Sequence, residues 1–386
     1  MTTSTSTPSP YRVCTRCIMD TSDVEIRFND EGVCNHCIRH QRQMRAFLKK
    51  GPDAEAALAS LVKRVQEGTG KQKYNCIIGL SGGVDSSYVA YVVKKVGLKP
   101  LAVHLDNGWN STEAVSNIKR IVSELDIDLY TEVLDWEEFR DLQLAFLRAS
   151  TPDSEIPTDH AIWALMMSSA VRWGVRHIII GRNLQSEGIL PRTWSRGHND
   201  WKYIKNVHKR FGTVPLKTFP HYSVVRHIHY RKVIRLQSTD ILNLVEYDRE
   251  DAKDILKREV GWQDYGGKHH ESIYTRFFQA YILPTKFGID KRRAHFSNLI
   301  SSGYMTREQA LGRMSSPPCQ PELMCTDKRF VAKKLGITET ELDQILAAPP
   351  KTIYDYPSHE RSRLYAFGRT IYQRLNGTAV DRLPEL

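Results

Sequence analysis

One short loop constrains this chain more than any other feature of its sequence. An apolar run at residues 76–80, suited to a buried parallel strand, leads into Ser81-Gly82-Gly83-Val84-Asp85-Ser86, and a helical pattern follows at 85–95. The two glycines let the backbone turn tightly and approach an anion without an obstructing Cβ. The start of the helix offers unpaired N–H groups and the positive end of the helix dipole. The segment is therefore predicted to bind phosphate.

The side chains of this loop sharpen the prediction. Ser81, Ser86 and Ser87 add hydroxyl donors, and the glycine spacing differs from that of the Walker loop and of the dinucleotide fingerprint. Asp85 would repel a bare phosphate, and a bound Mg²⁺ would remove that conflict. The alternative is that Asp85 only stabilises the start of the helix.

The pattern around the loop predicts an α/β fold. Strands are expected at 76–80, 101–105, 127–133 and 177–181, and helices at 85–95, 111–125, 136–149 and 158–174. Strands that alternate with helices in this way predict an open, doubly wound parallel sheet.

The second half of the chain is expected to be mostly helical. Residues 182–230 have an irregular pattern, and a loop of that length is usually functional or a lid. Helices are expected at 249–260, 271–283, 291–302, 306–314, 328–335, 338–346 and 361–375. The chain is thus divided into a disordered tail (1–10), a cysteine-rich ribbon with a helix (11–67), a phosphate-loop domain (68–247) and a helical substrate or partner domain (248–386).

Composition narrows the possible partners and location. The formal charge of +11 over 386 residues suits an anionic partner, or is only a solvated basic surface. No run approaches the ~20 apolar residues of a membrane span, and residues 1–10 do not resemble a secretory signal. Seven cysteines, an odd number that includes two tight pairs, favour a reducing compartment. We therefore expect a cytoplasmic protein.

The two cysteine pairs predict a metal site. Cys14 and Cys17 form one Cys-x-x-Cys pair, and Cys34 and Cys37 form another sixteen residues further on. Two such knuckles can close a tetrahedral Cys₄ zinc site, and four thiolates leave no open position for catalysis. The expected role of the Zn²⁺ is structural, and a redox role for either pair is the alternative.

The remaining cysteines show whether the chain could itself release ammonia, as a glutaminase does, or transfer sulfur. Residue 2 is Thr, so the nucleophile of an N-terminal glutaminase is missing, and Cys76 lies inside an apolar strand. A sulfur-transfer enzyme would have to use Cys319 or Cys325, which are more simply interpreted as ordinary loop thiols.

The phosphate loop resembles that of the PP-loop, or N-type, ATP pyrophosphatases. This superfamily includes GMP, NAD and asparagine synthetases and several tRNA-modifying enzymes. The resemblance implies that the loop binds the pyrophosphate of ATP while AMP is transferred to a carbonyl oxygen. Residues 103–108 resemble the synthetases' segment beside adenosine, which implies that His104 and Asp106 bind ATP and that Asn107 contacts the substrate. Residues 181–187 resemble a segment of NAD synthetases, which implies a role for Gly181 in the ATP site and for Glu187 as a second Mg²⁺ ligand.

The C-terminal half is similar to a narrower family, the N-acetyl sugar amidotransferases. The segments 261–272 and 287–295 and the cysteine arrangement carry this resemblance, which spans roughly residues 12–315, while residues 316–386 match no family. Such enzymes act in surface-polysaccharide (LPS O-antigen) and nonulosonic-acid synthesis. They convert an acetamido group on a sugar, often UDP-linked, to an acetamidino group. The implied partners are a glutaminase and a barrel-type subunit, both similar to imidazole glycerol phosphate synthase, which deliver ammonia.

The resemblance and the residue types suggest further roles. Lys268, His269 and Glu271 are expected around the reacting group; Lys268 and Glu271 are spaced i, i+3, and His269 could take a proton from the ammonium. The basic turn Lys291, Arg292 and Arg293 could hold pyrophosphate or a substrate carboxylate, or could be only a basic surface. Arg182 and Arg192 are weaker candidates for nucleotide phosphates.

Two alternatives stay open from the sequence. A tRNA-modifying PP-loop enzyme would explain the basic charge and the Cys₄ site. A non-catalytic RNA- or partner-binding scaffold is disfavoured by the intact loop motif. We expect a nucleotide-sugar substrate rather than a nucleic acid.

Overall fold

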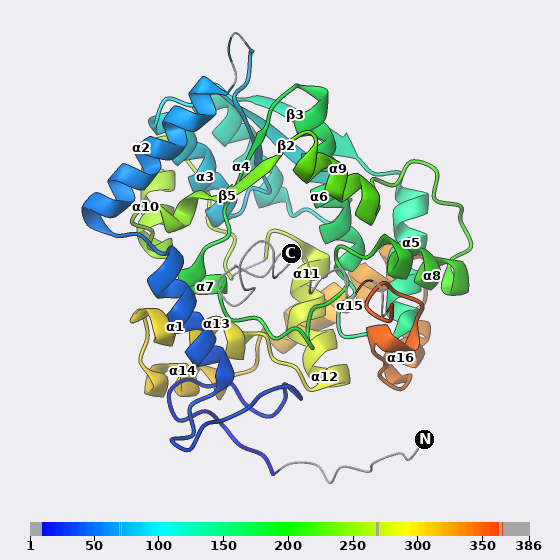
Figure 1. Cartoon of the computed structure of the whole chain (residues 1–386). Helices are drawn as coiled ribbons and strands as arrows, with labels where there is room; N and C mark the ends of the chain where they lie inside the picture. The colour runs from blue at the N-terminus through cyan, green and yellow to red at the C-terminus, as the bar shows by residue number, and fades with distance from the viewer. Residues whose placement is uncertain (1–9, 69, 71, 268–269, 363–364, 366–386) are drawn as a thin grey trace.

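The computed structural model describes residues 10–362 and 365, apart from 69, 71, 268 and 269. A parallel sheet with flanking helices occupies one half of the molecule (Figure 1). The C-terminal helices and the cysteine-rich N-terminal segment lie together in the other half. The chain thus folds around more than one core.

The sheet confirms the predicted doubly wound fold. In the described part of the chain it has five parallel strands in the order β3-β2-β1-β4-β5. They are β1 Cys76–Gly79, β2 Pro100–Asp106, β3 Asp128–Val133, β4 His177–Ile180 and β5 Gln237–Asp240. The strand order reverses between β1 and β4, and ligands bind such sheets beyond the carboxyl ends of the strands at that point. The phosphate loop follows β1 directly.

Helices cover both faces of the sheet. One face packs on α2 (Gly51–Glu67), α3 (Val84–Lys95), α4 (Thr112–Glu124) and α10 (Arg249–Val260). The other face packs on α6 (Ile156–Arg172). Strand β1 has apolar side chains on both faces: Ile78 belongs to the first layer and Ile77 to the second. This is the expected pattern for a central parallel strand.

The sequence pattern missed regular structure between residues 182 and 240. The segment expected to be irregular contains α7 (Leu184–Glu187), α8 (Trp201–Phe211) and α9 (Val224–Lys232). Strand β5 was also missed, because Gln-Ser-Thr-Asp offers no apolar alternation. It lies at the edge of the sheet and pairs only with β4, so backbone hydrogen bonds rather than burial define it.

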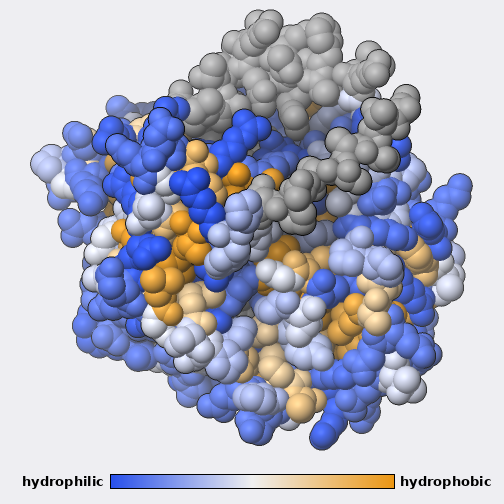
Figure 2. All heavy atoms as spheres, turned by 90° about the horizontal axis from the view of Figure 1, so that it is seen from below, coloured by the Kyte–Doolittle hydropathy of each residue, from blue (hydrophilic) through white to orange (hydrophobic). Residues whose placement is uncertain are grey.

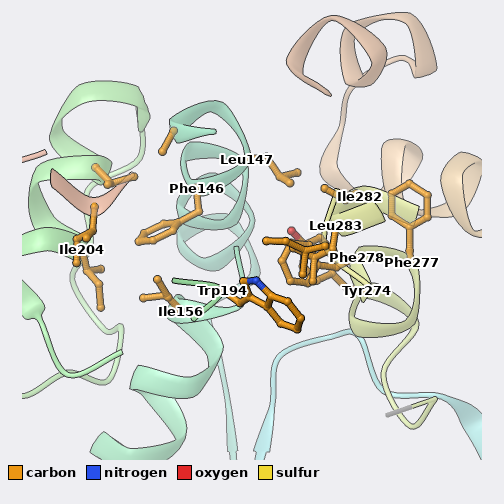
Figure 3. Packing of buried hydrophobic residues seen from close by; sticks show 14 of the residues in the cluster. Phe146, Leu147, Ile156, Trp194, Ile204, Tyr274, Phe277, Phe278, Ile282 and Leu283 are labelled. Carbon is orange, nitrogen blue, oxygen red and sulfur yellow. The ribbon is translucent and has the colours of Figure 1, made fainter. Parts of the chain in front are cut away.

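A second core joins segments that are far apart in the sequence. Figure 3 shows Phe146 of α5 (Trp136–Ala149), Ile204 of α8 and Trp194 packed with aromatic residues that follow Ser272. That stretch was predicted as one helix at 271–283 but runs as α11 (Ile273–Phe277), a π-helical turn (Phe278–Ile282) and α12 (Leu283–Phe287).

The other helices of this half match the predictions with changed ends. They are α13 (Arg292–Ser302), α14 (Arg307–Met314), α15 (Pro321–Leu335) and α16 (Glu339–Ala347). Helix α1 (Asn35–Phe47) differs more, because it begins inside the segment expected to form the cysteine-rich ribbon and includes Cys37. Helix α15 begins seven residues before its predicted start at 328, with Pro321 at its first position, where a missing N–H is tolerated. The predicted tail at 1–10 and helix at 361–375 lie mostly outside the described residues.

The surface seen from below in Figure 2 is mostly hydrophilic, with hydrophobic residues in small groups. Among the described residues, every helix is too short or too polar to cross a membrane.

Candidate active site and metal centre

The phosphate loop needs its first glycine for packing. Gly82 has φ of +79°, and a Cβ there would lie 2.3 Å from the carbonyl oxygen of Ala114 in α4. The Gly82 carbonyl accepts hydrogen bonds from Trp262 Nε1 at 3.0 Å and Asn117 Nδ2 at 3.4 Å. The turn is therefore fixed against α4 and against the segment that follows α10.

The polar groups of the loop bind one another in this structure. Ser86 Oγ accepts the N–H of Ser81 at 3.1 Å and lies 3.0 Å from Ser81 Oγ, which accepts the N–H of Gly83 at 3.3 Å. Ser81, Gly83, Asp85 and Ser86 line a pocket, as the sequence predicts. Their donors are positioned to exchange these internal bonds for bonds to an anion.

Ser87 departs from the prediction. Its side chain is fully buried, and its hydroxyl has no hydrogen-bond partner among the described residues. It lies in the first turn of α3 but does not line the pocket. We therefore remove Ser87 from the expected phosphate ligands.

Glu271 reaches the pocket through a strand-like contact. The N–H of Ser111 donates to the Glu271 carbonyl at 2.8 Å, and the N–H of Ile273 donates to the Trp109 carbonyl at 3.0 Å. This pairing directs Glu271 toward the loop, where a Cβ on Gly83 would lie 3.2 Å from its Oε1. The expected position of Glu271 at the reacting centre is thus consistent with the geometry. Lys268 and His269 lie outside the described residues.

Tyr265 was not predicted but also lines the pocket. Its hydroxyl accepts the N–H of Val84, in the first turn of α3, at 3.3 Å. Burial, and then the charge of Glu271, raise the pKa of Tyr265. The hydroxyl is therefore neutral and occupies a position where a phosphate oxygen could accept the same N–H.

Two further residues come from the start of α10. Tyr247 donates a hydrogen bond to Asp85 Oδ1, and burial, followed by the Asp85 charge, raises its pKa. Arg249, the first residue of α10, lines the pocket opposite the loop. The only sequence signal for Arg249 is a cation at a helix start, where acidic residues are preferred.

Besides burial, the charges of Asp85 and Glu187 both raise the pKa of Tyr247. The charge of Glu187 contributes to the raised pKa values of both Tyr247 and Asp240. Carboxylate oxygens are the protein ligands that Mg²⁺ uses, and the magnesium role expected for Asp85 and Glu187 stays a prediction.

Arg182 has a different role from the predicted one. Its Nη2 lies 3.0 Å from Asp240 Oδ2, and both side chains are mostly buried. Burial raises the pKa of Asp240 and the Arg182 charge opposes this shift. The arginine offsets a buried carboxylate, so we withdraw it as a substrate ligand. Arg192 instead lies 4.0 Å from Glu360.

Polar side chains at the carboxyl end of β2 form hydrogen bonds to nearby backbone and side-chain groups. His104 Nδ1 donates to the Leu80 carbonyl at 2.8 Å, and burial lowers the pKa of His104, which keeps the ring neutral. Asp106 accepts the N–H of Gly108 at 2.9 Å, and Asn107 Nδ2 donates to Thr158 Oγ1 at 3.3 Å. At the end of β4, a Cβ on Gly181 would lie 3.2 Å from the Asp85 carbonyl oxygen. None of these four residues lines the pocket described above, so their predicted ligand roles stay predictions.

The basic turn at 291–293 does not reach the pocket. Lys291 lies 3.8 Å from Glu155, and Arg292 pairs with Asp290 at 2.7 Å. Arg293 pairs with the buried Asp20 at 3.0 Å. None of the three lines the pocket, and each lies next to a carboxylate, so the prediction that they bind pyrophosphate or substrate gains no support from the geometry and stays a prediction.

The four paired cysteines form a compact, buried cluster. Their sulfur atoms all lie within 4.8 Å of one another, with Cys14–Cys37 at 4.0 Å and Cys17–Cys34 at 3.7 Å. Sulfurs on a tetrahedral ion with 2.3 Å bonds would be roughly 3.8 Å apart. Backbone N–H groups of Arg16, Cys34 and Cys37 donate to cysteine sulfurs at 3.2–3.4 Å, which stabilises thiolates. The cluster therefore fits a metal ion, and Arg307 anchors it by donating to the Cys14 and Cys17 carbonyls.

The other cysteines lie away from this chemistry. Cys76 is buried in β1, and burial raises its pKa. Cys319 and Cys325 do not line the pocket, and Cys325 lies in helix α15 rather than in the expected loop.

Comparison with known protein families agrees with this arrangement. Residues 55–140 match the NAD synthase family, and residues 271–372 match the family described as "LPS biosynthesis protein WbpG-like, C-terminal domain". The chain combines an NAD-synthase-like PP-loop domain with a WbpG-like C-terminal domain. PP-loop proteins use ATP and Mg²⁺, and the second match associates the chain with LPS biosynthesis. The match also corrects the expectation for residues 316–372, for which the sequence alone indicated no family.

Individual relatives cover only parts of the chain. An uncharacterized protein, MJ1599, of Methanocaldococcus jannaschii is 33% identical over 119 residues, which are 30% of this chain and 40% of the relative. The tRNA-specific 2-thiouridylase MnmA of Pediococcus pentosaceus is 25% identical over 132 residues, or 31% and 35% of the two chains. The chain thus spans about two-fifths or less of the length of these curated relatives.

Solved structures similar to this chain include NMN synthetase from Francisella tularensis, at 16% identity. The match covers 58% of this chain and 92% of that one, with a TM-score of 0.28. An NH3-dependent NAD synthetase from Campylobacter jejuni is 13% identical, covering 74% and 97%, with a TM-score of 0.29.

The WbpG-like domain contacts the PP-loop domain near the phosphate loop. Glu271, its first matched residue, enters the phosphate-loop pocket. Lys334 of α15 donates to the Gly108 carbonyl and lies 5.1 Å from the ring centres of both Trp109 and Trp136. The phosphate loop and the WbpG-like domain therefore contribute to one region.

Proposed function

We propose that the protein is an ATP-dependent amidotransferase that converts an acetamido group of a sugar, UDP-linked in our favoured case, to an acetamidino group. The observation that carries the proposal is the position of Glu271. A carboxylate from the WbpG-like domain lies beside the loop that holds ATP phosphates in PP-loop proteins.

In the proposed reaction, the amide oxygen of the N-acetyl group attacks the α-phosphate of ATP, and the bond to the departing pyrophosphate breaks. Ammonia then attacks the imidate carbon, the carbon–oxygen bond to AMP breaks, and the amidine forms. Because amides are weak nucleophiles, alignment and charge neutralisation must supply most of the acceleration. Glu271 would stabilise the amidinium cation, and Mg²⁺ held by Asp85 and Glu187 would neutralise phosphate charge.

The ammonia is proposed to come from a partner glutaminase through a barrel-type subunit. This is what the resemblance to the N-acetyl sugar amidotransferases implies. Ammonium chloride should therefore replace the partners in a purified assay.

The test is release of AMP by the full chain with ATP, Mg²⁺, ammonium chloride and a panel of N-acetylated sugar nucleotides. We expect AMP formation that depends on one sugar, and a product in which an NH group replaces an oxygen. Sugar-independent AMP release, or no AMP above background across the panel, would reject the proposal.

The rival function is tRNA modification, which the partial similarity to 2-thiouridylases favours. A thiolase would need a reactive cysteine near the ATP site, and the pocket-lining residues that the structure describes include none. RNA binding that weakens steeply with salt would favour this rival.

The Cys₄ cluster is proposed to hold a structural Zn²⁺. Metal analysis of the purified protein should find about one zinc ion per chain, and a Cys34→Ala variant should lose it. A metal-free, fully folded protein would contradict this assignment.

A further inference from the structure

The phosphate-loop pocket has an imbalance of charge. Asp85 and Glu271 line it, and among its lining residues that the structure describes, Arg249 alone is positively charged. A diphosphate would add further negative charge to this pocket. A cation is therefore needed at this position, in addition to any metal ion, for phosphate binding to be favourable.

Arg249 is suited to such a ligand because its side chain is not used elsewhere. Its Nε is buried and has no hydrogen-bond partner, and no ion pair is formed with the described residues. Its charge nevertheless acts in the pocket, because it opposes the raised pKa values of Tyr247 and Tyr265. Other arginines near the site, such as Arg182, are held by carboxylates.

The location of Arg249 does not stabilise its own helix. It is the first residue of α10, where the helix dipole disfavours a cation. Asp248 caps this helix by accepting the N–H groups of Glu250 and Asp251, so the helix start is complete without Arg249. Helices α3 and α10 lie against each other (Figure 1), and the first turns of both border the pocket. Two helix starts and one arginine thus face the same space.

We propose that Arg249 binds the diphosphate part of ATP and holds the departing pyrophosphate. The planar guanidinium can donate two parallel hydrogen bonds to phosphate oxygens, and the Nε that now lacks a partner supplies one of them. This inference rests on the ATP site of the proposed function, but not on the identity of the sugar.

The experiment measures binding of magnesium pyrophosphate and of AMP separately, by calorimetry, to the full chain. Arg249→Met removes the charge at similar size, and Arg249→Lys keeps the charge without the planar fork. The matched control is Arg258→Met, which alters an arginine at the other end of α10 that is 69% exposed and pairs with Glu259. Circular dichroism verifies that each variant is folded.

We expect Arg249→Met to weaken pyrophosphate binding about 10- to 100-fold and to change AMP affinity less than about threefold. Pyrophosphate affinity of Arg249→Lys should fall between those of Arg249→Met and wild type, and Arg258→Met should match wild type.

Unchanged pyrophosphate binding in Arg249→Met, or an equal loss for AMP, would overturn the inference. A wild-type chain that binds neither ligand would overturn it together with the ATP site. Arg249-dependent pyrophosphate binding without turnover of any sugar would reject only the amidotransferase proposal.

Discussion

The phosphate loop and the basic turn at 291–293 were both expected to bind anions, and the structure separates them. The loop has little charge, but its N–H and hydroxyl groups border a pocket. The basic turn has three cations, and each is engaged by a carboxylate: Glu155, Asp290 or Asp20. Anion binding is therefore indicated by donors that face an open space, and not by the density of positive charge.

The largest expected effect concerns the loop. Asp85→Asn keeps an oxygen that can accept from Tyr247 but removes the charge that would hold Mg²⁺. We expect AMP formation to fall about 10²- to 10³-fold at saturating ATP and Mg²⁺, with unchanged circular dichroism. Turnover equal to wild type would mean that the loop does not act on ATP as proposed.

Substitutions in the basic turn at 291–293 should lower the stability of the fold and leave ligand binding unchanged. Arg293→Met leaves the buried Asp20 without its ion-pair partner, so the free energy of unfolding in urea should fall by about 3 kcal/mol. Pyrophosphate affinity should stay within about twofold of wild type. A tenfold loss of that affinity, with normal stability, would restore the turn as a phosphate site.

The ion pairs of His198 with Asp153 and Asp159 should make the stability of the fold depend on pH. Burial disfavours the charged ring of His198, but Asp153 and Asp159, each 3.2 Å from Nε2, outweigh it and raise the His198 pKa from 6.5 to about 10. Protonated His198 therefore stabilises the fold fully below pH 6.5, and this contribution declines as the pH rises toward 10.

His198→Gln should lower the free energy of unfolding by about 2–4 kcal/mol at pH 6, and the difference from wild type should shrink between pH 7 and 10. Burial also opposes the charge of Asp153, yet the His198 contact lowers its pKa to about 2, so that contribution is lost only in strong acid. His229→Gln, on the exposed side of α9, serves as the control. A pH-independent difference would exclude a charged His198.

The smallest expected effects concern Ser86 and Ser87, whose substitutions should change ATP affinity to different extents. Ser86→Ala removes an acceptor for the Ser81 N–H and a pocket hydroxyl, so ATP affinity should fall about tenfold. Ser87→Ala removes a buried hydroxyl without a partner, so stability should change by less than about 0.5 kcal/mol and ATP affinity not at all. Equal losses of affinity for both variants would mean that Ser87 does reach the ligand.

The sequence by itself determined the features that depend on neighbouring residues. The strand–loop–helix pattern at 76–95, the parallel α/β fold and the two Cys-x-x-Cys knuckles follow from local rules of glycine conformation, apolar periodicity and thiol spacing. The polar edge strand β5 escaped prediction because its pairing, and not its composition, defines it.

Only the tertiary structure decided which side chains share the pocket. Glu271 arrives through pairing with residues 109–111, while Arg249 comes from the start of α10 and Tyr265 from the segment after that helix. Their sequence separation from the loop exceeds 150 residues, and no local pattern encodes such contacts. The same holds for Arg182 and the basic turn, because a cation is available to a ligand only if the fold has not already paired it.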